Sequence, residues 1–423
     1  GQVAQVTVGQ QQVPAGDLLF RHGPLTVGME ICRDGWKGPL RPAHYQVPQG
    51  ANLVLAPNAS HFALDKIYTR QGFVDEVLAA YPTGYALANL LGNEAGRILY
   101  DGHLSLGSQG SLHHREASLS LAPTRLAWAD MPLPPTAPKD DGPATLVPGS
   151  PIHPQDKPAS PPTLEPIPPK EAQLHRALTM GLWDYARKTR TRGFVISLSG
   201  GADSSACAVL AAQALHRAHT ELDAAQRQAA MPHLFTEAAP TYPMAQWLTC
   251  VYQGTDNSSA ETEASARLLA QDLGASYHYW NVQALSDSYR ALAEQALGRP
   301  LTWEQDDIPL QNIQSRLRAP GIWMLANTLG ALLLATSNRS EAAVGYATMD
   351  GDTAGGLAPI GGVDKHMLLN WLQWAEAELP VPGLRQVNSL QPTAELRPLE
   401  QKQTDEEDLM PYPLLDALER LAW

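Results

Sequence analysis

Cysteine is scarce in this chain of 423 residues, which contains only Cys32, Cys207 and Cys250. So small and odd a set does not provide the disulfide framework of a small secreted domain. Basic residues are also few, because 30 Lys and Arg stand against 43 Asp and Glu, for a formal net charge of −13. Binding to nucleic acid needs clustered cations, so the composition argues against that partner. We therefore expect a reducing, cytoplasmic setting, and locally placed cations for any polyanionic ligand.

The sequence has no apolar run long enough to cross a bilayer, which takes about 20 residues. The longest run, from Gly321 to Thr336, contains Asn327 and Thr328, and we interpret it as a buried helix. No membrane partner is expected. No signal peptide opens the chain, and residue 1 is Gly where a translated chain shows Met, so we expect an incomplete N-terminus.

Proline is concentrated between Met131 and Lys170, where it occurs 14 times. Proline lacks a backbone N–H and disfavours helix, so this stretch is predicted to be an extended linker, residues 131–170. It separates an N-terminal domain, residues 1–130, from a C-terminal domain, residues 171–423. Both lengths are compatible with folded domains, and the hydrophobic fraction of 44% is typical of globular proteins.

The C-terminal domain alternates apolar strands with amphipathic helices. The pattern predicts strands at residues 194–198, 248–252 and 276–282 and helices at residues 203–215 and 260–273. This alternation is typical of a doubly wound parallel sheet with ligands at the carboxyl ends of its strands. The N-terminal domain is also expected to be α/β, with strands at residues 25–31, 53–56 and 85–91 and a helix at residues 64–80.

The most informative segment follows the first strand of the C-terminal domain and reads Ser199-Gly-Gly-Ala-Asp-Ser204. Gly200 and Gly201 lack a Cβ, so the backbone can approach an anion, and the following helix offers free N–H groups. Ser199 and Ser204 add hydroxyl donors. A Gly-Gly pair alone is more often a turn, with Asp203 merely capping a helix. The full string, however, resembles the SGGxDS pyrophosphate loop of the N-type ATP pyrophosphatases, which include NAD, GMP and asparagine synthetases.

Four further segments follow in order: Leu310–Arg318, Ala335–Tyr346, Gly351-Asp352 and Pro359–Lys365. They resemble the QNxQxRxR, NxxExxxGY, GD and PIGGxxK segments of the NAD synthetases. The resemblance implies that ATP activates the nicotinate carboxylate of deamido-NAD as an acyl-adenylate. The products would be NAD, AMP and pyrophosphate, with nitrogen taken from ammonia, or from glutamine in the complete enzyme.

The same resemblance implies the roles of individual residues. It assigns ATP binding to Ser199, Gly200, Gly201, Asp203, Ser204 and Thr393, deamido-NAD binding to Asn312, Arg316, Asp352 and Lys365, Mg²⁺ to Asp203 and Glu341, and catalysis to Asp203 and Lys365. Read without the family, Glu341 is equally a surface carboxylate, Asp352 a turn residue and Lys365 a solvated cation. Arg316 and Arg318 begin an apolar helix, where a structural role is as well supported. The acidic run from Thr404 to Asp408 matches a lid-like segment.

In the N-terminal domain, Val27–Trp36 and Leu55–Phe62 resemble strands of the nitrilase-like (carbon–nitrogen hydrolase) glutaminase domain fused to many NAD synthetases. Cys32 then matches the catalytic nucleophile, although a cysteine after an apolar strand is more often structural. The family's Glu base and Lys lie upstream of the nucleophile, and the 31 residues before Cys32 contain no lysine. Glu30 is a poor substitute, because it lies on the nucleophile strand itself.

Arg33 is a second departure, because the family usually has a Glu there that binds the amino group of glutamine. We therefore expect the chain as given to use free ammonium and not glutamine. The family also implies a homo-oligomer. Two other functions stay open, an amidase whose nucleotide-binding domain only regulates it, and a catalytically silent assembly subunit.

Overall fold

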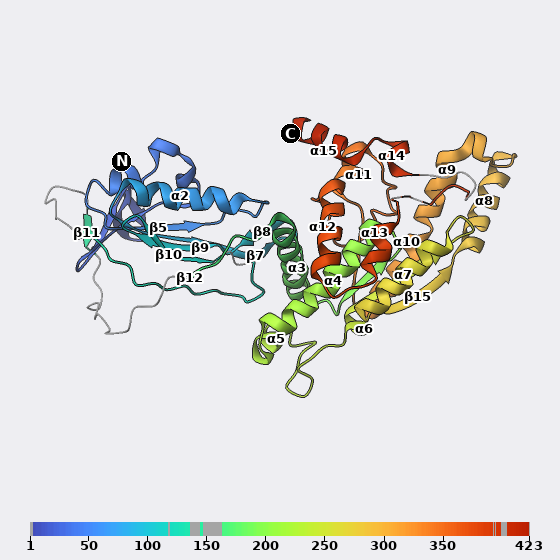
Figure 1. Cartoon of the computed structure of the whole chain (residues 1–423), viewed down its shortest axis with the longest axis horizontal. Coiled ribbons are helices and arrows are strands. Elements are labelled where there is room, and N and C mark those ends of the chain that lie inside the picture. Colours follow the sequence, from blue (N-terminus) through green and yellow to red (C-terminus); the bar gives the residue numbers. More distant parts are fainter. Residues whose placement is uncertain are drawn as a thin grey trace. The chain divides into compact units, whose positions relative to one another are not determined.

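The computed structural model describes residues 3–116, 119–135, 144–146, 163–391, 393, 395–398 and 404–422. The chain divides into two compact units, unit 1 (Gly1–Gln173) and unit 2 (Leu174–Trp423) (Figure 1). In the described part of the chain, no helix combines the length and apolarity that a membrane span requires.

Unit 1 is built on a mixed sheet of eight strands in the order β11-β3-β4-β5-β6-β9-β10-β12. Its strands are β3 (Leu19–His22), β4 (Leu25–Met29), β5 (Leu53–Asn58), β6 (Gly84–Asn89), β9 (Leu104–Ser108), β10 (Ser111–Glu116), β11 (Ala144–Leu146) and β12 (Thr163–Leu164). The central strands β4, β5 and β6 are parallel. Two separate hairpins pair β1 (Val3–Val8) with β2 (Gln11–Gly16) and β7 (Leu91–Glu94) with β8 (Ile98–Asp101). The three strands expected from the sequence are present within a few residues.

The edge strands β11 and β12 come from the proline-rich stretch. β11 pairs in parallel with β3, and β12 pairs in parallel with β10. An extended backbone is what proline favours, and it is also the conformation that a sheet edge can accept. These few residues of the expected linker therefore belong to the sheet.

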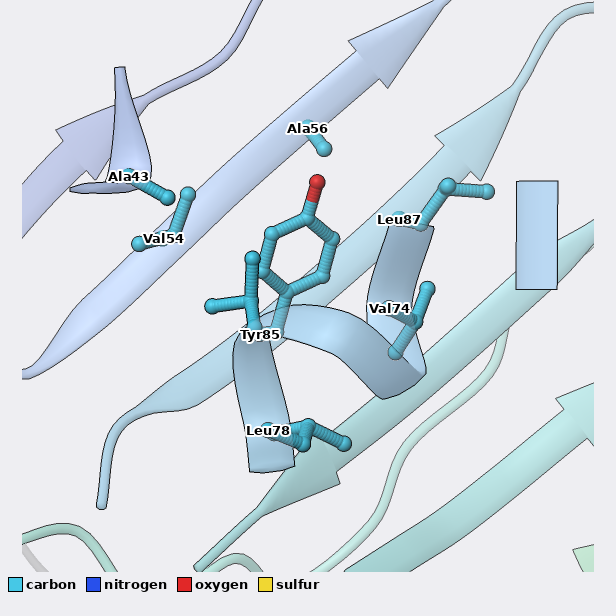
Figure 2. Close-up of a cluster of buried hydrophobic side chains, with 8 residues drawn as sticks. Ala43, Val54, Ala56, Val74, Leu78, Tyr85 and Leu87 are labelled. Atoms are coloured by element: carbon cyan, nitrogen blue, oxygen red, sulfur yellow. The ribbon is translucent and has the colours of Figure 1, made fainter. Parts of the chain in front are cut away.

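The core of unit 1 lies between the sheet and α2 (Lys66–Ala80), which contacts β6 and β9. Figure 2 shows the ring of Tyr85 within a buried cluster that also includes Val54 and Leu87 of the sheet and Val74 and Leu78 of α2. Alternate strand residues point to one face of a sheet, and helix residues four apart lie on one face of a helix. The sequence pattern therefore brings these side chains together.

Unit 2 contains a parallel sheet of four strands in the order β15-β14-β13-β16. The strands are β13 (Phe194–Ser197), β14 (Leu248–Gly254), β15 (Ser276–Asn281) and β16 (Leu332–Leu334), with crossover helices α4 (Ala202–Glu221), α7 (Ala260–Leu273) and α10 (Arg318–Leu329). Right-handed crossovers place α4 and α7 on one face. The return to β16 places α10 on the other face, against Val195, Val251 and Leu333. The doubly wound parallel sheet expected from the sequence is confirmed.

The remaining helices surround this sheet (Figure 1). They are α3 (Lys170–Thr189), α5 (Ala224–Ala230), α6 (Met244–Trp247), α8 (Gln283–Leu297), α9 (Trp303–Arg316), α11 (Arg339–Val344), α12 (Lys365–Glu378), α13 (Leu384–Ser389), α14 (Asp405–Asp408) and α15 (Tyr412–Ala422). In unit 1, α1 (Ala43–Gln46) and two short 3₁₀ helices, η1 (Cys32–Trp36) and η2 (Gly38–Leu40), precede β5. α12 packs on α4 and α13.

The expectation of one buried helix over Gly321–Thr336 is wrong. Gly330 adopts a φ of 62° and ends α10, and Leu332–Leu334 then forms β16 beside β13. The helical half is buried on one face only, since Ile322 and Ala326 are buried whereas Met324 is 69% exposed. An apolar run alone cannot distinguish a helix from a helix followed by a strand. The glycine in the left-handed conformation marks the boundary.

Candidate active site

A cavity of about 570 Å³ opens at the carboxyl end of β13 in unit 2. β13 is the first strand of this sheet in sequence, but it lies inside the sheet, with β14 on one side and β16 on the other. The chain runs outward from β13 to β14 and β15 and then returns past β13 to β16, so the strand order reverses beside β13. Such a switch point is where open α/β sheets bind ligands.

The loop between β13 and α4 is shaped by its serines. Ser204 Oγ accepts a hydrogen bond from the Ser199 amide at 3.1 Å and lies 2.9 Å from Ser199 Oγ, while the Gly201 amide donates to Ser199 Oγ at 3.3 Å. No side chain caps the N-terminus of α4, whose N-cap is Gly201. The free N–H groups of this 20-residue helix therefore face the cavity, as an anion requires.

Gly200 is required by the loop rather than by the cavity surface. Its φ is 84°, and a Cβ at this position would lie 2.1 Å from the carbonyl oxygen of Thr262. Both the backbone conformation and the close approach of α7 exclude a side chain. Gly200 is not among the residues lining the cavity, whereas Ser199, Gly201, Asp203 and Ser204 are.

Asp203, Glu341 and Lys365 meet in the cavity although they are far apart in sequence. Lys365 is 1% exposed, forms an ion pair with Asp203 and has its Nζ 3.7 Å from Glu341 Oε1. Burial and the nearby charge of Asp203 raise the pKa of Glu341 to about 8. Asn338 fixes both acids, donating from its side chain to Asp203 at 2.8 Å and from its backbone to Glu341 at 3.2 Å. The arrangement concentrates two carboxylates around one ammonium.

A second group of polar side chains lies on the segment after α11. Asp352 accepts from the Thr348 amide at 2.7 Å, and Asn312 accepts from the Thr348 hydroxyl at 3.1 Å. Burial raises the pKa of Asp352. Gly351 packs so closely that a Cβ would lie 2.1 Å from Ser315 Oγ. This packing fixes α9 and the Gly351-Asp352 turn as one wall of the cavity.

Most of the residues expected from the sequence line this cavity. They are Ser199, Gly201, Asp203, Ser204, Asn312, Glu341, Asp352, Lys365 and Thr393. Arg316 does not line it, since its side chain is exposed and its Nε donates to the carbonyl of Met349 at 2.9 Å.

Sequence reasoning did not single out Thr336, Tyr346 and Asp405, which also line the cavity, and it left Arg318 open between a site role and a structural role. Asp405 is 5% exposed and accepts hydrogen bonds from Tyr412 at 2.9 Å and Tyr346 at 3.4 Å. All four lie in or beside the matched segments, so their position in these motifs could have identified them as site residues. The acidic run was interpreted as a lid-like segment without naming the carboxylate that turns inward.

Cys32 belongs to unit 1, where it follows β4 and begins η1 with a φ of 49°. Such strain in a residue other than glycine is frequent at functional sites. Lys66 lies close by, with Nζ 5.6 Å from the ring centre of Trp36 and 3.2 Å from His61 Nε2. Burial lowers the pKa of Lys66, and the charge of a Cys32 thiolate opposes that effect. A cation within electrostatic range of Cys32 is therefore supplied by a segment downstream of it.

Glu30 does not serve Cys32 in this structure. It is 1% exposed, its Oε2 lies 2.8 Å from Arg41 Nη2, and it accepts from the Tyr85 hydroxyl at 2.7 Å. The Ala43 amide also donates to it at 3.0 Å. These bonds make Glu30 a structural carboxylate of the core.

Unit 2 combines a doubly wound α/β fold with a loop, residues 199–204, that resembles the phosphate loop of the ATP pyrophosphatases. The sequence model of the NAD synthase family matches residues 174–422, which is more than half of the chain. The chain belongs to the NAD synthase family.

Curated relatives extend the similarity to nearly the whole chain. A glutamine-dependent NAD(+) synthetase of Thermotoga maritima is 30% identical over 419 residues, which is 96% of this chain and 66% of that protein. The human glutamine-dependent NAD(+) synthetase is 28% identical over 459 residues, covering 97% of this chain and 64% of the human one. The chain thus spans slightly less than two thirds of the length of these relatives.

Solved structures agree with the fold. A glutamine-dependent NAD(+) synthetase from Cytophaga hutchinsonii superimposes with a TM-score of 0.78 and 39% identity, covering 100% of this chain and 63% of that one. A glutamine-dependent NAD+ synthetase from Acinetobacter baumannii, in complex with ADP, gives a TM-score of 0.64 at 19% identity over 96% of this chain and 68% of that one. At that identity the second match supports the fold alone.

Proposed function

We propose that the chain converts deamido-NAD to NAD with ATP, releasing AMP and pyrophosphate. The observation that carries this proposal is the convergence of the α4 N-terminus, Asp203, Glu341 and Lys365 on one cavity. An anion-binding loop beside two carboxylates and a buried ammonium suits cleavage between the α- and β-phosphates of ATP. We assign this activity to residues 171–423, and a nitrilase-like glutaminase fold to residues 1–130, with residues 131–170 between them.

The proposed reaction has two steps. An oxygen of the nicotinate carboxylate attacks the α-phosphorus of ATP, and the bond to the bridging oxygen of pyrophosphate breaks. The loop of Ser199, Gly201 and Ser204 then receives pyrophosphate, while Lys365 offsets its charge. Ammonia next attacks the acyl carbon, loses a proton and displaces AMP. No protein nucleophile is needed, so positioning and charge neutralisation supply the catalysis.

The donor set of Asp203 and Glu341 fits Mg²⁺, which binds through one or two carboxylates together with phosphate oxygens and water. The ammonium of Lys365 lies against both carboxylates, which supports the proposal that they hold a cation. Mg²⁺ held there would neutralise charge on the leaving pyrophosphate. Burial and the charge of Asp203 raise the pKa of Glu341, and a bound cation would oppose both effects.

Ammonia is the proposed nitrogen donor of unit 2. The relatives named above are glutamine-dependent, but Arg33 places an exposed cation after Cys32, where it would repel the α-ammonium of glutamine. We also propose a homo-oligomer, supported by the exposed apolar side chains Trp323 and Met324 on α10. A cytoplasmic location fits the three free cysteines.

The test is a product analysis with deamido-NAD, Mg-ATP and ammonium. NAD, AMP and pyrophosphate are expected in equal amounts. Formation of ADP and phosphate instead would refute the proposal, because the loop would then serve phosphoryl transfer rather than adenylation.

A further inference from the structure

Three cationic side chains line the cavity among the residues that the structure describes, and two of them are already paired. Lys365 forms its ion pair with Asp203. Arg397 forms ion pairs with Asp307 at 2.9 Å and Asp408 at 3.2 Å. The third cation is Arg318, the first residue of α10.

Arg318 uses only one edge of its guanidinium. Its Nε donates to the carbonyl oxygen of Gln253 at 3.1 Å. Its two terminal nitrogens form no hydrogen bond or ion pair with any residue in the described part of the chain. The carboxylate of Glu395 is engaged elsewhere, since it accepts from the Thr262 hydroxyl at 2.8 Å and from the Ser259 amide at 3.3 Å.

Without a ligand, the free energy of folding includes the cost of partly desolvating the Arg318 guanidinium. Burial lowers the pKa of Arg318, whereas the nearby charges of Tyr252 and Glu395 act in the opposite direction. A desolvated charge normally has an opposite charge beside it. The planar fork of an arginine matches two oxygens of a phosphate or carboxylate, and Nε anchors that fork at the end of β14, the neighbour of β13.

We propose that the terminal amino groups of Arg318 bind a phosphate oxygen of the nucleotide substrate. The identity of the nucleotides rests on the function proposed above. Phosphate esters occur in both ATP and deamido-NAD, and the shared chemistry is a tetrahedral oxyanion that accepts two N–H bonds. Arg318 is therefore a nucleotide-binding residue, distinct from Lys365 in forming no ion pair with a carboxylate among the residues that the structure describes.

The test measures equilibrium binding by calorimetry in the full chain, with ATP, deamido-NAD and adenosine each added alone. The variant Arg318→Gln removes the charge and keeps a polar side chain, and Arg318→Lys keeps the charge without the fork. For Arg318→Gln we expect the Kd of ATP, of deamido-NAD or of both to rise about 10- to 100-fold, as for loss of a charge-assisted hydrogen bond. Arg318→Lys should recover part of this loss. The Kd of adenosine, which has no phosphate, should change less than about twofold.

The nucleotide whose Kd rises in Arg318→Gln is the one whose phosphate Arg318 binds. Arg385→Gln is the matched control, because Arg385 is exposed on α13 and outside the cavity. Unchanged affinity for both nucleotides in Arg318→Gln would overturn the inference. An equal loss for adenosine would also overturn it, because Arg318 would then only shape the pocket through Gln253.

The two proposals can fail separately. Binding of single nucleotides involves no turnover, so a chain that made no NAD could still bind ATP through Arg318. Conversely, NAD formation with unchanged nucleotide affinity in Arg318→Gln would retain the proposed reaction and reject the role of Arg318.

Discussion

At the scale of single residues, the site depends on charged side chains that are far apart in sequence and that the fold brings within a few ångströms of one another. Asp203 and Glu341 lie on different helices, yet both approach the buried ammonium of Lys365. Two neighbouring carboxylates repel each other when both are ionised, and the ammonium of Lys365 offsets that repulsion. The chemistry of each residue is therefore set by its neighbours and not by its type.

Replacing Glu341 by Ala should lower turnover by roughly 100-fold or more, because metal stabilisation of phosphate charge supplies several kcal/mol. The proposed cause is weaker Mg²⁺ binding, so raised Mg²⁺ should restore part of the activity. Steady-state rates at several Mg²⁺ concentrations measure this. Glu378→Ala, an exposed position on α12, is the control. Equal rates for Glu341→Ala and the parent at limiting Mg²⁺ would show that Glu341 holds no metal.

Because His175 is buried as a neutral ring, we expect the stability of unit 2 to fall in acid. His175 is 7% exposed and stacked on Trp371, and burial, with the charges of Arg217 and Arg176, lowers its pKa to about 4. An unfolded histidine has a pKa of about 6.5, so the unfolded state binds the extra proton first. Stability from the neutral ring is thus present above pH 6.5 and is lost as the pH falls towards 4.

The expected loss is on the order of 3 kcal/mol over this window. Urea unfolding at several pH values measures it, and His175→Phe should remove most of the pH dependence. His216→Gln, on the exposed side of α4, is the matched variant and should keep the parent's profile. The same pH dependence in His175→Phe as in the parent would assign the acid sensitivity to other groups.

At the scale of elements, the phosphate loop is formed by the end of a strand, a tight turn and the start of a helix. β13 ends within the sheet, Gly200 turns the chain with a positive φ, and α4 begins without a capping side chain. The turn also contacts α7, whose Thr262 carbonyl leaves no room for a Cβ. The loop is therefore held by tertiary contacts as well as by its own residues.

Gly200→Ala should impair ATP binding by 10-fold or more and destabilise the fold by about 1–3 kcal/mol, because Ala must adopt a strained backbone and displace Thr262. ATP titration and urea unfolding measure the two effects. Gly72→Ala on α2 has open space around its Cβ. It should instead stabilise the chain by up to about 1 kcal/mol. Normal ATP affinity in Gly200→Ala would contradict the role assigned to the loop.

At the scale of the whole molecule, the chain consists of two units with separate candidate chemistry. Cys32 lies in unit 1, and the cavity with Asp203 and Lys365 lies in unit 2. If unit 2 alone carries the synthetase reaction with ammonia, the thiol of Cys32 takes no part in it.

Cys32→Ala should therefore leave ammonium-supported NAD formation within about twofold of the parent, a change below about 0.4 kcal/mol in activation free energy. The rate of NAD formation with saturating ammonium measures this. Glutamine in place of ammonium provides the second arm, and background rates are expected with both proteins. Glutamine-supported synthesis that disappears in Cys32→Ala would show that a complete glutaminase site forms despite Arg33.

Local sequence determined the elements that carry the site. Hydrophobic alternation predicted β13, β14, β15 and the helices α4 and α7 within a few residues, since side-chain periodicity follows directly from backbone geometry. The phosphate loop was predicted from the full string of residues 199–204 and its resemblance to the ATP pyrophosphatases, because a Gly-Gly pair alone is more often a turn. Gly321–Thr336 was misjudged, because uniform apolarity carries no period.

Only the tertiary structure decided which distant side chains share the cavity. The family motifs predicted that Asp203, Glu341 and Lys365 belong to one site. Burial of Glu341 and its closeness to the charge of Asp203, which raise the pKa of Glu341, depend on how the surrounding elements pack. Packing likewise left Arg316 exposed and Arg318, two residues later on the next helix, lining the cavity. The sequence contains both arginines in one motif, and the break between α9 and α10 at Leu317 determines which one lines the cavity.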